Sequence, residues 1–225
     1  MGINNISVIA IDGPSASGKG TVAQRVSGSL GFHYLDSGTF YRLVALVATR
    51  AGVDLADEEA LANIAEHLNV VFEDKEIRLG NEDVADIIRT ETCGNGASRI
   101  AAHSQVRVAL LSHQRAFRRY PGLVADGRDM GSVVFPDATL KIFLVASAEM
   151  RAQRRYKQLM EKGVDVNIAT ILQDIRERDA RDSCRSVSPL KQGADTSFID
   201  TTLLNITEAV NEVLRQYARI CAKNG

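Results

Sequence analysis

The segment from Gly13 to Thr21 combines glycines, hydroxyl side chains and a lysine in an order that can hold phosphate groups. Glycines let the chain curl tightly, so that several backbone N–H groups converge on phosphate oxygens. Lys19 adds a mobile cation for the terminal phosphates. The segment therefore predicts binding of a nucleoside triphosphate. The predicted contacts are Gly13, Pro14, Ser15, Ala16, Ser17, Gly18, Lys19, Gly20 and Thr21.

The elements on either side of this segment must position it. Residues 6–11 are an apolar run typical of a buried strand, and Val22, Val26 and Leu30 follow at helical spacing. A helix that begins here presents free N–H groups and the positive end of its dipole to an anion. Strand, loop and helix together predict a phosphate-binding P-loop. Gly20 stands where Ser or Thr usually follows the lysine, and this Gly-Lys-Gly-Thr ending is typical of nucleoside monophosphate kinases.

Further apolar segments extend this pattern into a sheet. They alternate with helical patterns, which predicts a doubly wound α/β fold with a five-stranded parallel sheet flanked by helices. The last helix begins near Asn205, and Glu208 three residues later completes a capping box. The predicted strands are residues 7–11, 33–35, 123–125, 141–145 and 197–199.

One segment departs from this alternation. Residues 68–88 have apolar positions at alternate residues, with turns at Asp74-Lys75 and Gly80-Asn81. They predict a small antiparallel insertion between the second and third strands of the main sheet. Such an insertion can be a mere surface decoration, but in a kinase it would hold the second substrate. We expect one domain, residues 1–225, with this insertion occupying about 61–103.

The composition limits the classes of function. A chain of 225 residues fits one domain, and a net charge of −1 gives no case for general nucleic-acid binding. We find no apolar run long enough to span a membrane and no basic start of a signal peptide, so we expect a cytoplasmic protein. The three cysteines are far apart and lack metal-ligand spacing. A monomer is the simplest expectation.

Two polar segments follow predicted strands. Residues 36–42 (Asp-Ser-Gly-Thr-Phe-Tyr-Arg) place a helix start where it suits a phosphate or a polar ring edge, although an ordinary N-cap has the same residues. Residues 125–131 lie at the carboxyl end of a strand, where ligands collect in open α/β sheets. There Arg128 and Asp129 are adjacent opposite charges, which a solvated turn with a local ion pair would also explain.

An arginine-rich stretch completes the set of candidate segments. Two predicted helices carry these arginines, and residues 163–165 between them form a hinge or lid tip. Arg178, Arg181 and Arg185 recur at three- and four-residue spacing, so they share one helix face. A charged face of this kind is often merely solvated. The arginines are Arg151, Arg154 and Arg155 on the first helix, and Arg176, Arg178, Arg181 and Arg185 on the second.

Together these segments resemble the bacterial cytidylate kinase family over essentially the whole chain. The motifs that carry the resemblance are residues 12–21, 36–38 with Tyr41-Arg42, 125–131, and 178–182 followed by Arg185. The resemblance implies a P-loop kinase fold that transfers the γ-phosphoryl group of ATP to CMP or dCMP. It also implies that the insertion is the one peculiar to the bacterial enzymes, and that residues 155–167 form a short lid.

The resemblance further implies roles for single residues. The cytosine ring would contact Ser37, Arg107, Asp129 and Arg185, and the ribose would contact Arg178 and Asp182. The acceptor phosphate would contact Arg42 and Arg128, and the pocket would also be lined by Ser98 and Tyr41.

The chemistry of such a transfer explains why arginines are needed. The acceptor phosphate is already ionised near neutral pH, so the reaction needs no general base. Cations must offset the repulsion between the two phosphate groups and follow the charge in the transition state. Lys19 would act on the β- and γ-phosphates, and Mg²⁺ would bind through phosphate oxygens and water with Thr21 nearby. The candidates to close over the transferring group are Arg154, Arg178 and Arg181.

Three other classes of protein stay open at this point. A monophosphate kinase selective for UMP or AMP would share most of these segments. A small-metabolite kinase of the shikimate type shares the P-loop and an arginine-rich lid, but it is usually shorter and lacks the insertion. A nucleotide-binding switch usually carries an Asn-Lys-x-Asp loop that reads the base, and this sequence has none.

Overall fold

The computed structural model describes all residues except 1–5, 74–75, 162, 185–189, 191–192 and 225. The chain forms two compact units. The first, called here the sheet unit, comprises Met1–Asp36 and Arg115–Gly225, and the second, the inserted unit, comprises Ser37–Gln114. The description of residues 1–225 as one domain, and the bounds of about 61–103 and 155–167 for the insertion and the lid, stay predictions.

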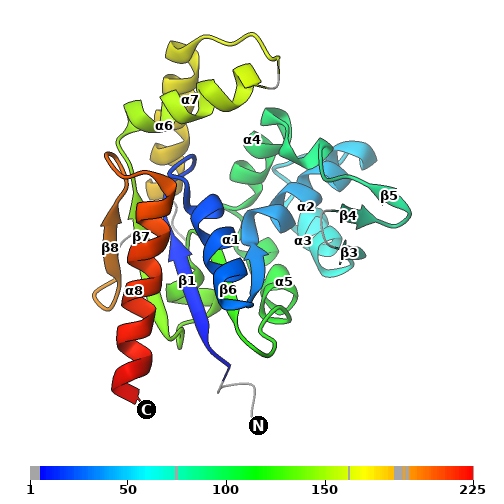
Figure 1. Cartoon of the computed structure of the whole chain (residues 1–225). Helices are drawn as coiled ribbons and strands as arrows, with labels where there is room; N and C mark the ends of the chain where they lie inside the picture. The colour runs from blue at the N-terminus through cyan, green and yellow to red at the C-terminus, as the bar shows by residue number, and fades with distance from the viewer. Residues whose placement is uncertain (1–5, 74–75, 162, 185–189, 191–192, 225) are drawn as a thin grey trace. The chain divides into compact units, whose positions relative to one another are not determined.

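The sheet unit contains the predicted parallel sheet (Figure 1). Its strands pair in the order β2-β6-β1-β7-β8, and every pair is parallel. The five-stranded parallel sheet is therefore confirmed. The strands are β1 (Val8–Asp12), β2 (His33–Asp36), β6 (Leu123–Gly127), β7 (Leu140–Val145) and β8 (Ser197–Asp200).

Four α-helices of the sheet unit cover or extend this sheet. In Figure 1, α1 and α8 lie in front of the strands, while α6 and α7 lie side by side at the top. A short π-helical turn, η3 (Met130–Val134), follows β6. The helices are α1 (Lys19–Leu30), α6 (Ala148–Glu161), α7 (Ile168–Cys184) and α8 (Ile206–Asn224).

Apolar faces explain why these elements pack. β1 is a continuous run of buried residues, as expected for a central strand covered on both faces. Val22 and Val26 of α1 and Val213 of α8 belong to the same buried cluster as the strand residue Ile11. The predicted capping box is present at the start of α8, where the backbone N–H of Asn205 donates to Glu208 Oε2 (2.8 Å) and the N–H of Glu208 returns a hydrogen bond to Asn205 Oδ1 (3.0 Å).

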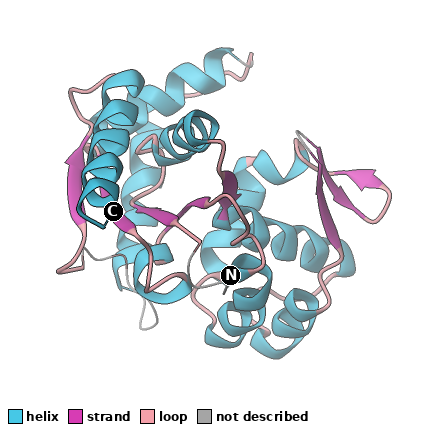
Figure 2. Ribbon diagram, turned by 60° about the horizontal axis from the view of Figure 1, so that its bottom comes forward, coloured by secondary structure: helices cyan, strands magenta, loops and turns pink. Residues whose placement is uncertain are grey.

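The inserted unit contains the predicted meander. β3, β4 and β5 form a separate antiparallel sheet, visible in magenta in Figure 2. Gly80 has φ +61° in the turn between the last two strands, a left-handed conformation that favours glycine. The turn at 74–75 lies outside the described residues. The elements are α2 (Ser37–Ala51), α3 (Glu58–Glu66), β3 (Val70–Glu73), β4 (Glu76–Leu79), β5 (Glu82–Asp83), η2 (Ile87–Arg89), α4 (Glu91–Ile100) and α5 (Ser104–Arg115).

None of the helices among the described residues is long and apolar enough to cross a lipid bilayer. Within the inserted unit, a contact between two aromatic rings connects the small sheet to α2. Phe40 of α2 is almost fully buried, and its ring packs edge-on against Phe72 of β3, with 5.4 Å between the ring centroids. This contact ties the small sheet to the helix that carries the polar segment 36–42.

Candidate active site

The P-loop connects β1 to α1 and requires glycine at two positions. A Cβ atom at Gly13 would lie 2.0 Å from the carbonyl oxygen of Leu144, so only glycine lets the loop approach β7 this closely. Gly18 has φ +92° immediately before the first residue of α1. Among the described residues, the Oγ atoms of Ser15 and Ser17 are buried without a hydrogen-bond partner. The loop therefore presents polar groups that a phosphate would satisfy.

Lys19 is half-buried at the start of α1, where its charge is poorly solvated. The pKa of its ammonium is lowered to about 8, first by desolvation and then by the neighbouring Arg128, while Asp126 and Asp36 act in the opposite direction. Its Nζ donates a hydrogen bond to the carbonyl oxygen of Pro14 (3.4 Å). A phosphate dianion beside this group would restore the lost solvation of the charge.

Asp126, which is buried, pairs with the half-buried Tyr34 next to Lys19. The Tyr34 hydroxyl donates to Asp126 Oδ1 (2.8 Å), which joins β2 to β6. The pKa of Asp126 is raised to about 7, first by burial and then by the neighbouring Asp36, whereas Lys19 acts to lower it. Asp126 lies within the motif of residues 125–131, but the sequence alone indicates no role for it. Its position at the end of an apolar strand was the sequence feature that could have marked Asp126 as a site residue.

Asp12 holds the turn that carries the predicted acceptor residues. Its two carboxylate oxygens accept the backbone N–H groups of Met130 (2.8 Å) and Gly131 (2.9 Å). Burial raises its pKa to about 6, although these two hydrogen bonds act to lower it. Asp12 therefore fixes the chain immediately after Arg128 and Asp129, a task that sequence reasoning missed because the partners are backbone groups.

Two of the predicted acceptor residues are brought together at the end of β6. Arg128 Nε donates to Asp182 Oδ2 (2.8 Å), and both side chains are largely buried. Asp182 lies on α7, and Arg178 lies one turn earlier on the same helix. Asp129 is buried directly before η3. Arg181 of α7 is exposed.

Arg154 of α6 contacts the backbone. It donates to the carbonyl oxygens of Ser17 (3.0 Å), Thr201 (2.5 Å) and Leu204 (3.4 Å), and to the hydroxyl of Thr201 (3.2 Å). The guanidinium thus links the P-loop to the segment that follows β8. Its predicted action on a transferring phosphoryl group stays a prediction.

The inserted unit carries the other predicted acceptor residues. The guanidinium of Arg107 lies 6.0 Å from the ring centroid of Tyr41 and donates to the carbonyl oxygen of Ala101 (3.3 Å). Arg42 donates from Nη1 to the carbonyl oxygen of Ile88 (2.6 Å). Ser98 of α4 is buried, and its Oγ has no hydrogen-bond partner among the described residues. Ser37 is buried at the first position of α2.

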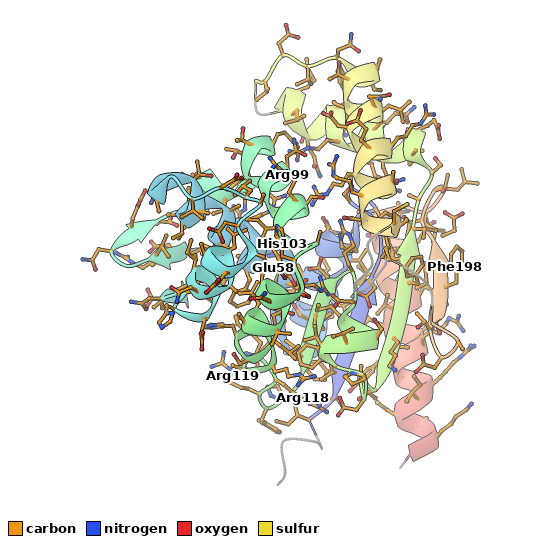
Figure 3. The ribbon with its side chains drawn as sticks, turned by 180° about the vertical axis from the view of Figure 1, so that it is seen from behind. Glu58, Arg99, His103, Arg118, Arg119 and Phe198 are labelled. Carbon is orange, nitrogen blue, oxygen red and sulfur yellow. The ribbon has the colours of Figure 1, made fainter. Side chains whose placement is uncertain are left out.

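Polar contacts at the start of α5 hold the helix that carries Arg107. Glu58 accepts the backbone N–H of Gln105 (2.8 Å) and the hydroxyl of Ser104 (3.0 Å). His103 Nε2 lies 2.9 Å from the carbonyl oxygen of Leu55. Figure 3 labels Glu58 and His103 beside each other in this region. These contacts fix the terminus of the helix that carries Arg107.

The predicted residues divide between the two units. One further predicted residue, Arg185, lies outside the described residues. Within the described part of the chain, no cluster of three or more His, Cys, Asp or Glu side chains could hold a metal ion. The sheet unit contains Lys19, Arg128, Asp129, Arg154, Arg178, Arg181 and Asp182, and the inserted unit contains Ser37, Tyr41, Arg42, Ser98 and Arg107.

Known proteins resemble this chain in sequence and in fold. A cytidylate kinase from Nitrosomonas europaea is 59% identical over 218 residues, covering 97% of this chain and 98% of its own. One from Nitrosomonas eutropha is 60% identical over 213 residues, covering 95% of both chains. The crystal structure of a gluconokinase from Sinorhizobium meliloti covers 96% of this chain and 94% of its own, with a TM-score of 0.50 and 14% identity, and shares the fold alone. The sequence profile described as cytidylate kinase matches residues 9–219. The chain therefore belongs to the cytidylate kinase family.

Proposed function

We propose that this protein transfers the γ-phosphoryl group of ATP to CMP or dCMP, which gives ADP and CDP or dCDP. The family match over residues 9–219 supports this reaction. The structural observation that carries it is the pairing of β1 with β6, in which Asp12 lies opposite Gly127. The P-loop that follows β1 and Arg128 that follows β6 therefore leave the same edge of the sheet, where a donor phosphate and an acceptor phosphate could meet for a direct transfer.

The donor site in this proposal is the P-loop. Backbone N–H groups from Gly13 to Thr21 and the N-terminus of α1 would bind the ATP phosphates, and Lys19 would bind the β- and γ-phosphates. The buried hydroxyls of Ser15 and Ser17 support this role, because they have no protein partner among the described residues.

Mg²⁺ fits this site as an ion bound mainly to ATP. Mg²⁺ keeps several waters and binds to substrate phosphates with few protein ligands. The described residues supply no three-ligand cluster, but Thr21 is exposed at the start of α1 and two carboxylates, Asp36 and Asp126, lie close enough to influence Lys19. When bound, the ion would neutralise charge on the β- and γ-phosphates.

The proposed acceptor contacts are those that the family resemblance implies. Arg42 and Arg128 would hold the acceptor phosphate, and Arg178 and Asp182 would hold the ribose. The other proposed contacts, to the cytosine ring and the pocket wall, are Ser37, Arg107, Asp129, Arg185, Ser98 and Tyr41.

The transfer itself would be a direct in-line displacement without a general base. The acceptor phosphate has a second pKa of about 6 and is ionised at neutral pH. The protein contributes position and positive charge, and lid closure would exclude water that otherwise hydrolyses ATP. Arg154, Arg178 and Arg181 are the candidates to act on the transferring group. The hydrogen bonds of Arg154 to three backbone carbonyls favour a positioning part for that residue.

Selectivity for cytosine follows from Asp129. The exocyclic amine of cytosine donates a hydrogen bond that a carboxylate accepts, whereas uracil presents a carbonyl oxygen that a carboxylate repels. The burial of Asp129 supports this role, because a buried carboxylate discriminates more strongly than a solvated one.

We also propose that the protein acts in the cytoplasm as a monomer on small-molecule substrates, without nucleic-acid or membrane partners. The net charge of −1 supports the absence of a nucleic-acid partner.

The reaction can be tested with a panel of acceptors. Purified protein is mixed with Mg-ATP and either CMP, dCMP, UMP or AMP, and ADP formation is followed. We expect strong turnover with CMP and dCMP and little with UMP or AMP. Preferred turnover of UMP or AMP would overturn the base assignment, and no turnover with any acceptor would overturn the proposed reaction.

A further inference from the structure

Arg151 of α6 has no role in the site described above, although its surroundings are unusual for an arginine. The residue is only 5% exposed. Its guanidinium makes two hydrogen bonds to Asp179 of α7, from Nη1 to Oδ1 (3.0 Å) and from Nη2 to Oδ2 (2.5 Å). It also donates from Nε to the carbonyl oxygen of Ala146 (3.0 Å) and from Nη1 to that of Ser15 (3.2 Å). Arginine suits such a position because its donors are held in a rigid planar fork.

These four hydrogen bonds join three parts of the sheet unit that bear on catalysis. Ser15 belongs to the P-loop, Ala146 directly follows β7, and Asp179 lies on the helix that carries the proposed substrate residues. Asp179 is the immediate neighbour of Arg178 and precedes Asp182 by three residues. The position of α7 at this point is therefore set by an arginine that also holds the P-loop.

A second ion pair fixes α7 one turn further along. Asp182 accepts from Arg128 at the carboxyl end of β6. Because residues three apart are neighbours on a helix surface, the two carboxylates anchor adjacent points of α7. Asp179 connects α7 through Arg151 to the P-loop, which is the proposed donor site. Asp182 connects α7 to Arg128, which belongs to the proposed acceptor site.

The positive charge of Arg151 is offset by the carboxylate of Asp179. We therefore expect Arg151 to affect the substrates through the position of α7 and not through its own charge. A small apolar cluster of Ala152, Ile171 and Ile175 packs α6 against α7, and Ala16 of the P-loop packs against this cluster. Apolar contacts of this kind are non-directional, so they hold the parts together without fixing their exact alignment. The guanidinium of Arg151 donates directional hydrogen bonds to both Ser15 and Asp179, and these bonds fix the position of α7 relative to the P-loop. Arg154 also holds a P-loop carbonyl, yet its other hydrogen bonds connect it to Thr201 and Leu204, which follow β8.

We propose that Arg151 is a positioning residue that, through Asp179, couples the P-loop to the substrate-binding face of α7. This inference rests on the proposed function, because it assigns the two ends of the link to ATP and to the acceptor. Binding at one end then favours the arrangement that the other end needs, and such a coupling acts equally in both directions.

A second ion pair between the same helices offers a matched control. Arg176 of α7 donates from Nη2 to Glu149 Oε1 of α6 (3.1 Å). These side chains are 59% and 62% exposed. The pair joins α6 to α7 as the proposed pair does, but on the solvent side.

The test compares the variants Arg151→Lys, Asp179→Asn and their combination with Arg176→Gln, Glu149→Gln and their combination. Thermal unfolding identifies the temperature at which each variant is folded, and steady-state kinetics give kcat and KM for ATP and CMP. The affinity for a non-hydrolysable ATP analogue is measured with and without CMP. Arg151→Lys retains the charge and a single donor group, while Asp179→Asn retains the shape.

We expect Arg151→Lys and Asp179→Asn each to lower kcat/KM for CMP by about tenfold to a hundredfold, the cost of misplacing a substrate site. The double variant should lose no more than the worse single variant, because both changes break one link. The effect of CMP on affinity for the ATP analogue should shrink in these variants and stay unchanged in the controls.

Unchanged kinetics and unchanged coupling in folded Arg151→Lys and Asp179→Asn would overturn the proposal and leave Arg151 a purely structural residue. Equal changes in the control pair would overturn it as well. Failure of the proposed function would look different: wild-type protein would prefer another acceptor, and the same coupling measurement would then be made with that acceptor.

Discussion

The hydroxyl of Tyr34 donates a hydrogen bond to Asp126 Oδ1 across 2.8 Å and joins neighbouring strands at the carboxyl edge of the sheet. Strands β2 and β6 are thereby connected by a side-chain hydrogen bond in addition to the backbone hydrogen bonds between them. The same carboxyl group lies close enough to Lys19 to raise the pKa of that lysine. A contact that stabilises the sheet thus also shapes the electrostatics of the P-loop.

The stability of the protein should depend on pH through Asp126. Its pKa is raised from 3.8 to about 7 in the folded protein, so the folded state holds a proton that the unfolded chain has released. The free energy of unfolding should therefore fall as pH rises between these two values. Asp12, with a pKa of about 6, acts in the same direction, whereas the lowered pKa of Lys19 acts only above about pH 8.

Asp126→Asn removes one of these titrating groups and keeps an acceptor for Tyr34. We expect the melting temperature of this variant to depend less on pH between about 4 and 7 than that of the wild type. Asp86→Asn, at an exposed carboxylate, serves as the control. The melting temperature of each protein is measured by thermal unfolding across this pH range. Identical pH profiles for wild type and Asp126→Asn would contradict the raised pKa of Asp126.

Lys19→Ala should abolish most of the turnover without loss of the fold. We assign Lys19 to the β- and γ-phosphates, and removing one preorganised donor commonly costs about 10²–10³ in kcat. Steady-state ADP formation and thermal unfolding measure the two effects. Lys223→Ala, at the exposed end of α8, is the control. Activity of Lys19→Ala within a few-fold of wild type would remove this residue from the site.

Asp129→Ala should reduce turnover of CMP far more than turnover of UMP. The carboxylate accepts from the cytosine amine and repels the uracil oxygen, and such a contact is worth about 1–3 kcal/mol, or roughly tenfold to a hundredfold. The ratio of kcat/KM for CMP to that for UMP is the quantity to measure. If the ratio stays at its wild-type value, another residue reads the base.

Asp182→Ala should raise KM for CMP more than KM for dCMP. Both acceptors should suffer, because Asp182 also holds Arg128. Only CMP has the 2′-hydroxyl that the carboxylate can bind. The variant therefore loses one more hydrogen bond to CMP than to dCMP, and a hydrogen bond to a charged group contributes about 1.5–3 kcal/mol of binding free energy. Kinetics with both acceptors test this, and equal losses would show that Asp182 acts through Arg128 alone.

Gly13→Ala and Gly20→Ala should differ strongly in stability, although both lie in the P-loop. A Cβ at Gly13 would meet the carbonyl oxygen of Leu144 at 2.0 Å, and this backbone atom cannot move aside. A Cβ at Gly20 would meet the Tyr34 hydroxyl at 3.6 Å, which is an ordinary contact. We expect Gly13→Ala to lose at least ~2 kcal/mol of stability and Gly20→Ala to change little. Denaturant unfolding measures both, and similar losses would contradict the loop geometry.

The elements of the fold could be predicted from the sequence because their signals are local. Apolar runs gave the five strands of the main sheet, alternation gave the small antiparallel sheet, and the Asn205–Glu208 capping box needs only a four-residue window. The P-loop glycines are local in the same sense. Each of these features is decided by residues within a short stretch of chain.

The links between distant residues could not be predicted in the same way. Tyr34 and Asp126 are 92 positions apart, and nothing in either sequence neighbourhood indicates the other. The arginines pose a different difficulty, because a guanidinium binds a phosphate and a backbone carbonyl with the same donors. Arg151 and Arg154 therefore looked like the other arginines of their helix until their partners were known.

The hydrogen bonds of Arg154 also bear on how this protein can diverge. Three of its acceptors are main-chain carbonyl oxygens, at Ser17, Thr201 and Leu204, and every amino acid supplies such an oxygen. Substitutions at Ser17 and Leu204 can therefore accumulate without loss of the link, whereas an insertion or deletion that changes the path of the chain would break it. Among relatives, we expect the length of this segment to be kept more strictly than its side chains.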